Sequence, residues 1–235
     1  MILFTIAAVT RWEMKLQRLA LKQIVSTHEQ NKYLHQGKET MNPISEKIET
    51  FLNEMTFFKQ IELDPKDKGI LKHPDVSTLK NKTTGDTPLH YAAKYHKEVL
   101  QHPDVSKVTN KRGETPLHIA AYYHKEALSH PDVAKVKDKN EYTPLHNSAM
   151  KFKEALSHPD VAKVHREKNN GDTPLHIAAQ HYKEVLQHPD VAKAKNKYGQ
   201  TPLHYAVYRH KEALQHPDAF KVKDADGKTP RELVM

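Results

Sequence analysis

Histidine is the residue type in this sequence that most readily suggests chemistry, because the chain of 235 residues contains 18 histidines and no cysteine. Histidine side chains can ligate zinc and can act as general acids or bases. The absence of cysteine excludes disulfides, thiolate zinc sites and cysteine nucleophiles. The sequence also shows no ordered set of serine, histidine and aspartate, no glycine-rich phosphate loop and no isolated pair of carboxylates. Catalysis therefore has no visible location.

Most of the histidines belong to two short motifs that recur in a fixed phase. Thr-Pro-Leu-His returns at intervals of 28, 28, 30 and 28 residues, and a degenerate Thr-Pro-Arg-Glu follows 28 residues after the last copy. A catalytic tripeptide is needed once, whereas a motif that returns in every unit is structural. The single His-Pro-Asp loop of J-domain co-chaperones is therefore a poor model for this chain. Thr-Pro-Leu-His begins at Thr87, Thr115, Thr143, Thr173 and Thr201, and His-Pro-Asp begins at His73, His102, His130, His158, His188 and His216.

His-Pro-Asp has the properties of a helix terminator. Pro103 lacks an amide hydrogen and disfavours helical backbone at the residue before it, so the preceding helix should end at His102. We expect His102 to bond the last carbonyls of the helix and Asp104 to cap the following turn. Thr-Pro-Leu-His instead marks a helix start, because Thr115 can serve as the N-cap and Pro116 suits the first helical position.

Each unit is predicted to contain a turn, a helix of about eight residues, a short second helix that ends at His-Pro-Asp, and a segment that leads back to the next turn. A glycine stands two residues before most of the threonines, where a turn with positive φ requires it. Glu141 occupies this position once, so we expect that turn to be strained or differently shaped. The few large apolar side chains of one unit cannot compensate for ordering its 28 residues, so the units must stack. The predicted fold class is an all-α helix-turn-helix repeat solenoid.

The segment 70–235 resembles the ankyrin-repeat family in its turn glycines, its Thr-Pro-Leu-His motif and its alanine pairs such as Ala92-Ala93. The resemblance implies an ankyrin-like domain of about five full repeats with a half-repeat C-terminal cap at 226–235. The units here are shorter than the family's usual length of about 33 residues. The difference falls in the second helix and its exit, where His-Pro-Asp stands.

The first part of the chain lacks the repeat. Residues 42–69 are predicted to form an N-terminal capping helix, because Asn-Pro opens a segment with a helical apolar stripe. Residues 1–41 are predicted to hold a helix at 14–25 and a linker. That helix fits a second cap, a partner-binding or membrane-surface helix, or a segment outside the natural protein if translation starts at Met14 or Met41. The apolar run at the N-terminus has nine residues, which is too short to span a bilayer.

The histidines of Thr-Pro-Leu-His are not predicted to bind a metal. Stacked helices lie about 8–10 Å apart, whereas zinc needs ligand nitrogens at about 2.0–2.1 Å. Histidines of successive units therefore cannot share one ion, and each is expected to bond a neighbouring turn. We accordingly predict no metal, no cofactor and no enzymatic activity.

The resemblance also implies where a partner protein would bind. In ankyrin-like proteins the residues after the alanine pair, together with the turn residues beside the glycine, line a concave face that grips partners. Tyrosine, methionine and arginine, which are enriched at interface centres, occupy several of these positions here. The alternative is that some of the tyrosines pack between helices. The predicted partner-binding residues are Tyr95, Lys111, Arg112, Tyr122, Tyr123, Tyr142, Met150, Lys151, His181, Tyr198, Tyr208 and Arg209.

A second hypothesis is that the chain binds a polyanion, such as nucleic acid or an acidic surface. The formal net charge is +8 and the isoelectric point is near 9.3. One lysine recurs in the same phase after five of the six His-Pro-Asp motifs, and we favour a solvated edge without a partner as the explanation of this ladder. We expect a monomer without a membrane span, either cytoplasmic or a secreted effector acting in a host cell. The ladder residues are Lys107, Lys135, Lys163, Lys193 and Lys221.

Overall fold

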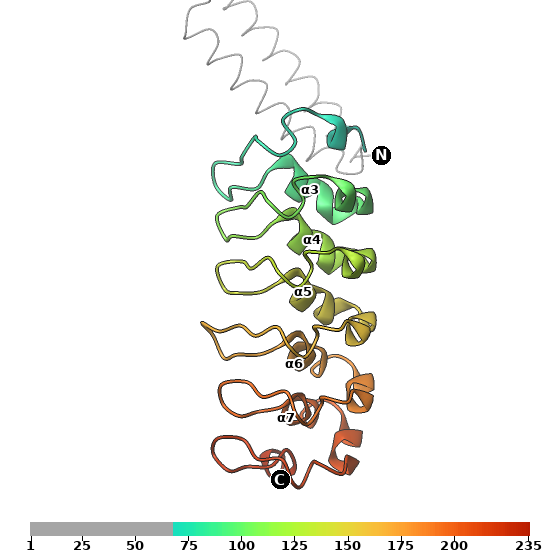
Figure 1. The fold of residues 1–235 in the computed structure, drawn as a ribbon, viewed down its shortest axis with the longest axis vertical. Coiled ribbons are helices and arrows are strands. Elements are labelled where there is room, and N and C mark those ends of the chain that lie inside the picture. Colours follow the sequence, from blue (N-terminus) through green and yellow to red (C-terminus); the bar gives the residue numbers. More distant parts are fainter. Residues whose placement is uncertain (1–67) are drawn as a thin grey trace, which may run out of the picture. The chain divides into compact units, whose positions relative to one another are not determined.

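The computed structural model describes residues 68–235, which form a stack of short helices joined by turns (Figure 1). These residues belong to a compact unit that spans Lys66–Met235. The N-terminal helix and linker expected at 1–41 lie outside the described residues, as does all but the end of the capping helix expected at 42–69. No strand occurs within the described part of the chain.

Each repeat contributes one α-helix and one short 3-10 helix, and we number the repeats from their threonines: repeat 1 (87–114), repeat 2 (115–142), repeat 3 (143–172), repeat 4 (173–200) and repeat 5 (201–228). A first 3-10 helix, η1 (Lys68–Lys72), precedes repeat 1, and η7 (Arg231–Leu233) follows repeat 5. The α-helices are α3 (Pro88–Tyr95), α4 (Pro116–Tyr123), α5 (Pro144–Lys151), α6 (Pro174–Ala178) and α7 (Pro202–Ala206). The 3-10 helices are η2 (Lys97–Gln101), η3 (Lys125–Ser129), η4 (Lys153–Ser157), η5 (Lys183–Gln187) and η6 (Lys211–Gln215).

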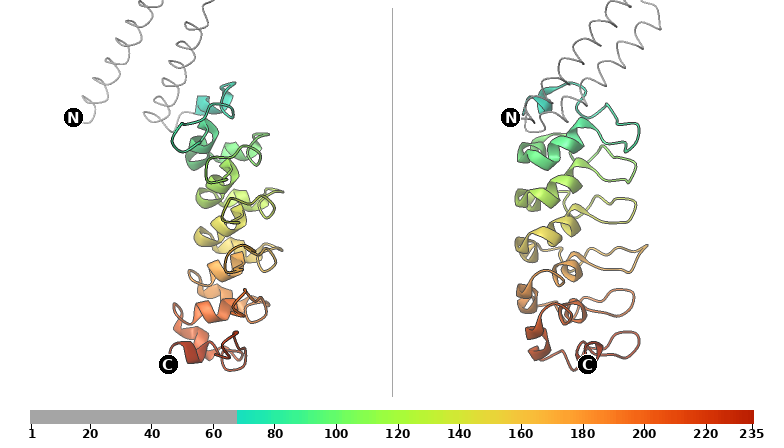
Figure 2. Two further views of the ribbon diagram at one scale, coloured as in Figure 1. Left: turned by 90° about the vertical axis from the view of Figure 1, so that its left-hand side faces the viewer. Right: turned by 180° about the vertical axis from the view of Figure 1, so that it is seen from behind.

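The repeats stack in chain order, which confirms the predicted helical solenoid. Each α-helix from α3 to α6 packs against the next one, and the turns project to one side of the helices in both views of Figure 2. One leucine in each repeat has no exposed surface, and small alanines beside it let successive helices approach closely. The core is therefore a continuous column built around Leu89, Leu117, Leu145, Leu175 and Leu203.

The two recurring motifs are halves of one hydrogen-bonded unit. In repeat 2 the backbone N–H of Leu117, near the start of α4, donates to the carbonyl of Val105 at 2.9 Å. Val105 directly follows the preceding His-Pro-Asp, so this turn satisfies an N–H group that the helix itself cannot. The same bond joins Leu89 to Val76 and recurs in every later repeat. This pairing explains why the two motifs keep the same phase.

The predicted stop at His-Pro-Asp is confirmed, but its side chains act differently from expectation. The 3-10 helix η2 ends at Gln101, and His102 adopts extended backbone. Instead of bonding helical carbonyls, the Nδ1 atom of His102 accepts the N–H of Asp104 at 3.2 Å. The carboxylate of Asp104 accepts the hydroxyl of Ser77 at 2.8 Å rather than capping its own turn. The neighbouring repeat offers a donor to the carboxylate, which a prediction from one isolated unit could not anticipate.

The second helix of each repeat is a single 3-10 turn of five residues, not a short α-helix. Proline closes the segment so early that too few residues remain for a regular series of α-helical bonds, and 3-10 geometry is common in such short segments. Successive 3-10 helices are joined by exposed ion pairs from one repeat to the next. Lys97 Nζ lies 3.3 Å from Glu126, Lys125 Nζ lies 3.9 Å from Glu154, and Lys153 Nζ lies 3.9 Å from Glu184.

The turns before each threonine are bonded to one another along the stack. The N–H of Lys139 donates to the carbonyl of Arg112 at 3.0 Å. Gly113 directly follows Arg112 and has a φ of 78°, and a Cβ atom on Gly113 would lie 2.9 Å from the backbone nitrogen of Lys139. Glycine is therefore required both for its φ and for its lack of a side chain.

The turn of Glu141 keeps the hydrogen bonds and the positive φ of the glycine turns, so of the two expected outcomes the strained backbone is the one observed. Glu141 has a φ of 62°, and it is buried. Its carboxylate accepts the backbone N–H of Lys168, whose ammonium lies 3.9 Å away from it. The next turn along the chain, 165–171, contains the two residues that lengthen the interval from Thr143 to Thr173 from 28 to 30 residues. The side chain of Glu141 thus replaces the backbone bond that joins the other turns.

Candidate functional site

The ends of the first helices present most of the side chains predicted to bind a partner. In α4, Ala120 and Ala121 are fully buried, whereas Tyr122 is half-buried and Tyr123 is exposed. The helix thus packs through its alanines and projects the two residues that follow them. We call the surface formed by these two positions in every repeat the helix-end face, which comprises Lys94, Tyr95, Tyr122, Tyr123, Met150, Lys151, Gln180, His181, Tyr208 and Arg209.

Aromatic rings and ammonium groups contact one another across repeats on the helix-end face. Tyr95, Tyr123 and Tyr208 expose 39%, 44% and 59% of their surface, which is high for large apolar side chains. The ammonium of Lys94 lies 5.3 Å from the ring centroid of Tyr95 and 5.7 Å from that of Tyr123. Lys151 lies 4.6 Å from the ring centroid of Tyr122. Such cation–π contacts restrict the side chains before any partner arrives.

The helix-end face carries positive charge without a compensating carboxylate. None of its ten residues is acidic. Two carboxylates of the adjoining turns are engaged inside the protein: Glu114 pairs with Arg112 at 2.7 Å, and buried Asp172 accepts the hydroxyl of Tyr205 at 2.9 Å. The pKa of His181 is lowered, first by burial and then by the charges of nearby basic residues. The local potential therefore favours an acidic partner.

The predicted turn residues differ in their accessibility. Lys111, Arg112 and Tyr198 are exposed. Tyr142 is half-buried, because the guanidinium of Arg166 stacks 3.7 Å from its ring centroid and the ring centroid of His146 lies 5.6 Å from that of Tyr142. Arg166 belongs to the turn with two additional residues, so sequence reasoning could not place it over this ring.

Met150 is also half-buried, and it packs against the apolar cluster that contains buried Ala155. Its side chain contributes to stacking as well as to the helix-end face. Of the other predicted residues, Lys151 and Arg209 are exposed.

Sequence reasoning missed a hollow between repeats 4 and 5. It has a volume of about 360 Å³ and is lined by Gln180, Gln200, His204, Tyr205, Tyr208 and Arg209. Three of these residues belong to the helix-end face, but Gln200 comes from the turn and Tyr205 from the middle of α7. The juxtaposition depends on the packing of two repeats, so no local pattern in the sequence indicates it.

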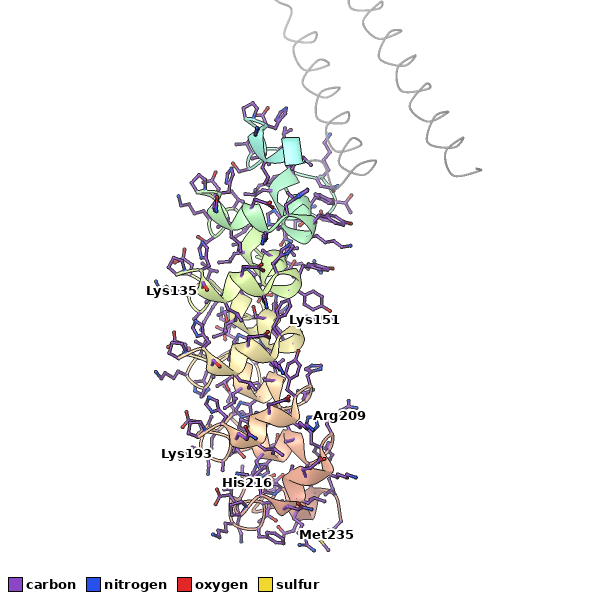
Figure 3. The ribbon with its side chains drawn as sticks, turned by 90° about the vertical axis from the view of Figure 1, so that its right-hand side faces the viewer. Lys135, Lys151, Lys193, Arg209, His216 and Met235 are labelled. Atoms are coloured by element: carbon purple, nitrogen blue, oxygen red, sulfur yellow. The ribbon has the colours of Figure 1, made fainter. Side chains whose placement is uncertain are left out.

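The lysine ladder lies on a different edge of the stack. Figure 3 shows Lys135 and Lys193 on one side of the ribbon and Lys151 and Arg209 on the other. All five ladder lysines are exposed, but each follows the aspartate of its His-Pro-Asp by three residues. One of these pairs is an ion pair, with 3.8 Å between Lys135 Nζ and Asp132 Oδ1. The aspartates reduce the positive potential of this edge.

The histidines of Thr-Pro-Leu-His act as structural links, as predicted. In repeat 2 the N–H of Thr115 donates to His118 Nδ1 at 3.0 Å, and His118 Nε2 donates to the carbonyl of Tyr142 at 3.0 Å. The carbonyl can only accept, so the neutral ring carries its proton on Nε2. Burial lowers the pKa of His118, and the equivalent bonds recur for His90, His146, His176 and His204.

Within residues 68–235 no three histidine or acidic side chains are grouped so that they could hold a metal ion. No helix in that part of the chain combines the length and the apolar character needed to cross a membrane.

The repeat length, the turn glycines and the stacked pairs of helices can now be set beside known families. A model of the ankyrin-repeat family, built from three copies, matches residues 68–135 and 151–222, which together make up more than half of the chain. This chain belongs to the ankyrin-repeat family. Ankyrin repeats are generally protein–protein interaction modules, and they present binding surfaces along a stack. No curated protein matches the chain.

The interval between the two matched segments, 136–150, spans the end of repeat 2 and the start of repeat 3, where the sequence departs from the other repeats. Besides Glu141, it includes Asn147 and Ser148, of which Ser148 takes the place of the first alanine of the pair. The hydroxyl of Ser148 donates to the carbonyl of Ala121 at 2.9 Å, and the amide of Asn147 donates to the carbonyl of His118 at 2.9 Å. Both polar side chains bond helix α4, so the ankyrin stacking continues through this repeat.

Proposed function

We propose that this ankyrin-repeat protein is a non-enzymatic scaffold that binds a partner protein on its helix-end face. The observation that carries the proposal is that three exposed tyrosines, of repeats 1, 2 and 5, share the helix-end face with the basic side chains of Lys94, Lys151 and Arg209. Tyrosine and arginine are frequent at the energetic centres of interfaces. Of the five large aromatic side chains that are exposed in the described part of the chain, three belong to this face.

The mechanism is binding by a preorganised surface. The helices below the helix-end face are fixed by buried leucines and by the histidine links between repeats. Contacts such as that between Lys151 and Tyr122 hold the side chains above them. Folding has therefore already ordered the surface that a partner contacts, which reduces the entropy lost on binding.

The test compares three forms of the full chain in affinity capture. One variant replaces Tyr95, Tyr123 and Tyr208 by alanine; all three side chains are exposed, so the fold should remain. Met150 and Tyr122 are left unchanged because they are half-buried. The control variant replaces the five ladder lysines by glutamine.

We expect the tyrosine variant to lose the partners that the wild type retains, with the affinity of an isolated partner reduced at least about tenfold. The ladder variant should retain them. If the ladder variant loses the partners instead, and binding weakens steeply with salt, the chain is a polyanion binder and the proposal is wrong. Thermal unfolding of all three proteins establishes that differences in binding do not come from unfolding.

A further inference from the structure

The hollow between repeats 4 and 5 differs chemically from the rest of the helix-end face. It is bounded by Gln180, which follows the first helix of repeat 4, by the turn residue Gln200, and by residues within and after α7. Arg209 projects from the same edge of the stack as Lys151 (Figure 3). A volume of about 360 Å³ falls in the range of sites that enclose a ligand group, above about 300 Å³, although this hollow is open on one side.

The floor of the hollow is apolar because its polar atoms are engaged elsewhere. The hydroxyl of Tyr205 donates to Asp172 at 2.9 Å and lies 3.1 Å from the amide of Asn196. Both ring nitrogens of His204 are also bonded, Nδ1 to Thr201 and Nε2 to the carbonyl of Lys228. These two rings and that of Tyr208 therefore offer mainly carbon atoms to an occupant. An aliphatic or aromatic side chain would be stabilised there by burial.

The rim of the hollow offers hydrogen-bond donors. The amides of Gln180 and Gln200 and the guanidinium of Arg209 have no side-chain hydrogen bond or ion pair to any described residue. The carboxylate that belongs to this region, Asp172, is buried and accepts bonds from Tyr205 and Asn196. Arg209 is thus a cationic donor without an internal acceptor, and its planar guanidinium can bind the carboxylate of a protein partner through two parallel hydrogen bonds.

We propose that the hollow receives an apolar side chain of the partner protein that is flanked by an aspartate or glutamate. The apolar group lies against Tyr205 and Tyr208, and the carboxylate pairs with Arg209 and the two amides. This inference rests on the proposed function, because it assumes that a protein partner occupies the helix-end face. It adds that the partner segment is acidic and that repeats 4 and 5 hold its anchor.

The experiment selects peptides from a displayed library of random dodecapeptides on the full wild-type chain. We expect enrichment of peptides with net negative charge that carry an aliphatic or aromatic residue next to aspartate or glutamate. The most enriched peptide is then synthesised, and its affinity is measured by calorimetry for the wild type, Arg209→Gln, Tyr123→Ala and Lys193→Gln. Lys193 is an exposed ladder lysine on the edge opposite Arg209 (Figure 3), so Lys193→Gln is the matched control for the loss of one positive charge. Tyr123 lies on the helix-end face but outside the hollow, so Tyr123→Ala tests the face separately from the hollow.

The expected result is that R209Q weakens binding of the peptide at least about tenfold, as for loss of a charge-assisted pair, while K193Q changes it less than about twofold, as for a surface residue outside the contact. Arg209 is exposed, so R209Q should unfold at the wild-type temperature. Enrichment of neutral or basic peptides, or an unchanged affinity in R209Q, would overturn the inference. If binding then depends on Tyr123, the proposed function survives without the hollow. If no selected peptide depends on any exposed tyrosine of the helix-end face, the proposed function falls as well.

Discussion

Acidification should destabilise the repeat stack through its buried histidines, and His146 gives the clearest case. Its Nδ1 atom accepts the N–H of Thr143 at 3.1 Å, and its Nε2 atom donates to the carbonyl of Asp172 at 3.2 Å. A second proton would have to bind at Nδ1, where it would face a donor. Burial, the largest cause, lowers the pKa of His146 to about 3, and that of His176 to about 4.

The magnitude follows from the difference between the folded and unfolded pKa values. Well above about pH 6.5, the ordinary pKa of histidine, both rings are neutral in the folded and the unfolded chain, so they do not lower the free energy of unfolding there. As the pH falls below about 6.5, the two histidines bind protons in the unfolded chain but not in the folded chain. The free energy of unfolding therefore decreases until the pH reaches the pKa of the folded state. At pH 5 each of the two histidines should lower it by about 2 kcal/mol. The pKa values of His90, His118 and His204 are also lowered by burial, so their contributions have the same sign.

Urea denaturation followed by far-ultraviolet circular dichroism at pH 7.5, 6 and 5 measures this effect. We expect the wild type to lose at least about 4 kcal/mol between pH 7.5 and 5. His146→Gln cannot titrate, so the destabilisation that it causes at pH 7.5 should shrink by about 2 kcal/mol at pH 5. The control is His181→Gln, because His181 is exposed and is not bonded to a threonine at a helix start. The lowered pKa of His181 gives a contribution of the same sign, but this variant should keep much more of the pH dependence of the wild type than H146Q does. A wild type that is equally stable at pH 7.5 and 5, or an H146Q variant with the wild-type pH dependence, would refute the reasoning.

Three further predictions concern the stack. Gly113→Ala should lower the free energy of unfolding by more than about 2 kcal/mol. Gly227→Ala, which has the same φ of 78° but no atom within 4 Å of the added Cβ, should lower it by only about 1–2 kcal/mol. Equal losses in urea denaturation would contradict the role of the Lys139 contact. Leu117→Ala should lower the free energy of unfolding by about 2–5 kcal/mol, because this side chain has no exposed surface, and a loss below 1 kcal/mol would show that the site is not packed as described. The exposed pair Lys125 and Glu154, 3.9 Å apart, should give a coupling energy below about 1 kcal/mol in a double-mutant cycle and none at high salt; a larger, salt-independent value would indicate a buried interaction.

The recurring motifs made much of the fold predictable. Threonine followed by proline marked the start of each α-helix from α3 to α7, and the proline of His-Pro-Asp marked the end of each 3-10 helix from η1 to η6. The histidine column was interpreted correctly as a set of links to neighbouring turns, because zinc geometry excluded a shared ion. These features depend on a few adjacent residues, whose backbone preferences act locally.

Contacts between repeats were not predictable in the same way. The bond from Ser77 to Asp104 and that from Lys168 to Glu141 each join residues about one repeat apart, so their partners follow only from the stacking geometry. The cover that Arg166 provides over Tyr142 depends on the shape of a turn with two additional residues. The hollow beside Tyr208 likewise requires the relative position of two repeats. The sequence indicated which positions vary on the helix-end face, but not which of them are covered.

Hydrogen–deuterium exchange of the full chain with and without an isolated partner tests the central claim most directly. The account predicts added protection at the ends of the first helices, at 94–95, 122–123, 150–151, 180–181 and 208–209, and little change at the ladder lysines and the His-Pro-Asp turns on the other edge. Protection confined to the ladder edge, with the helix-end face unchanged, would contradict it.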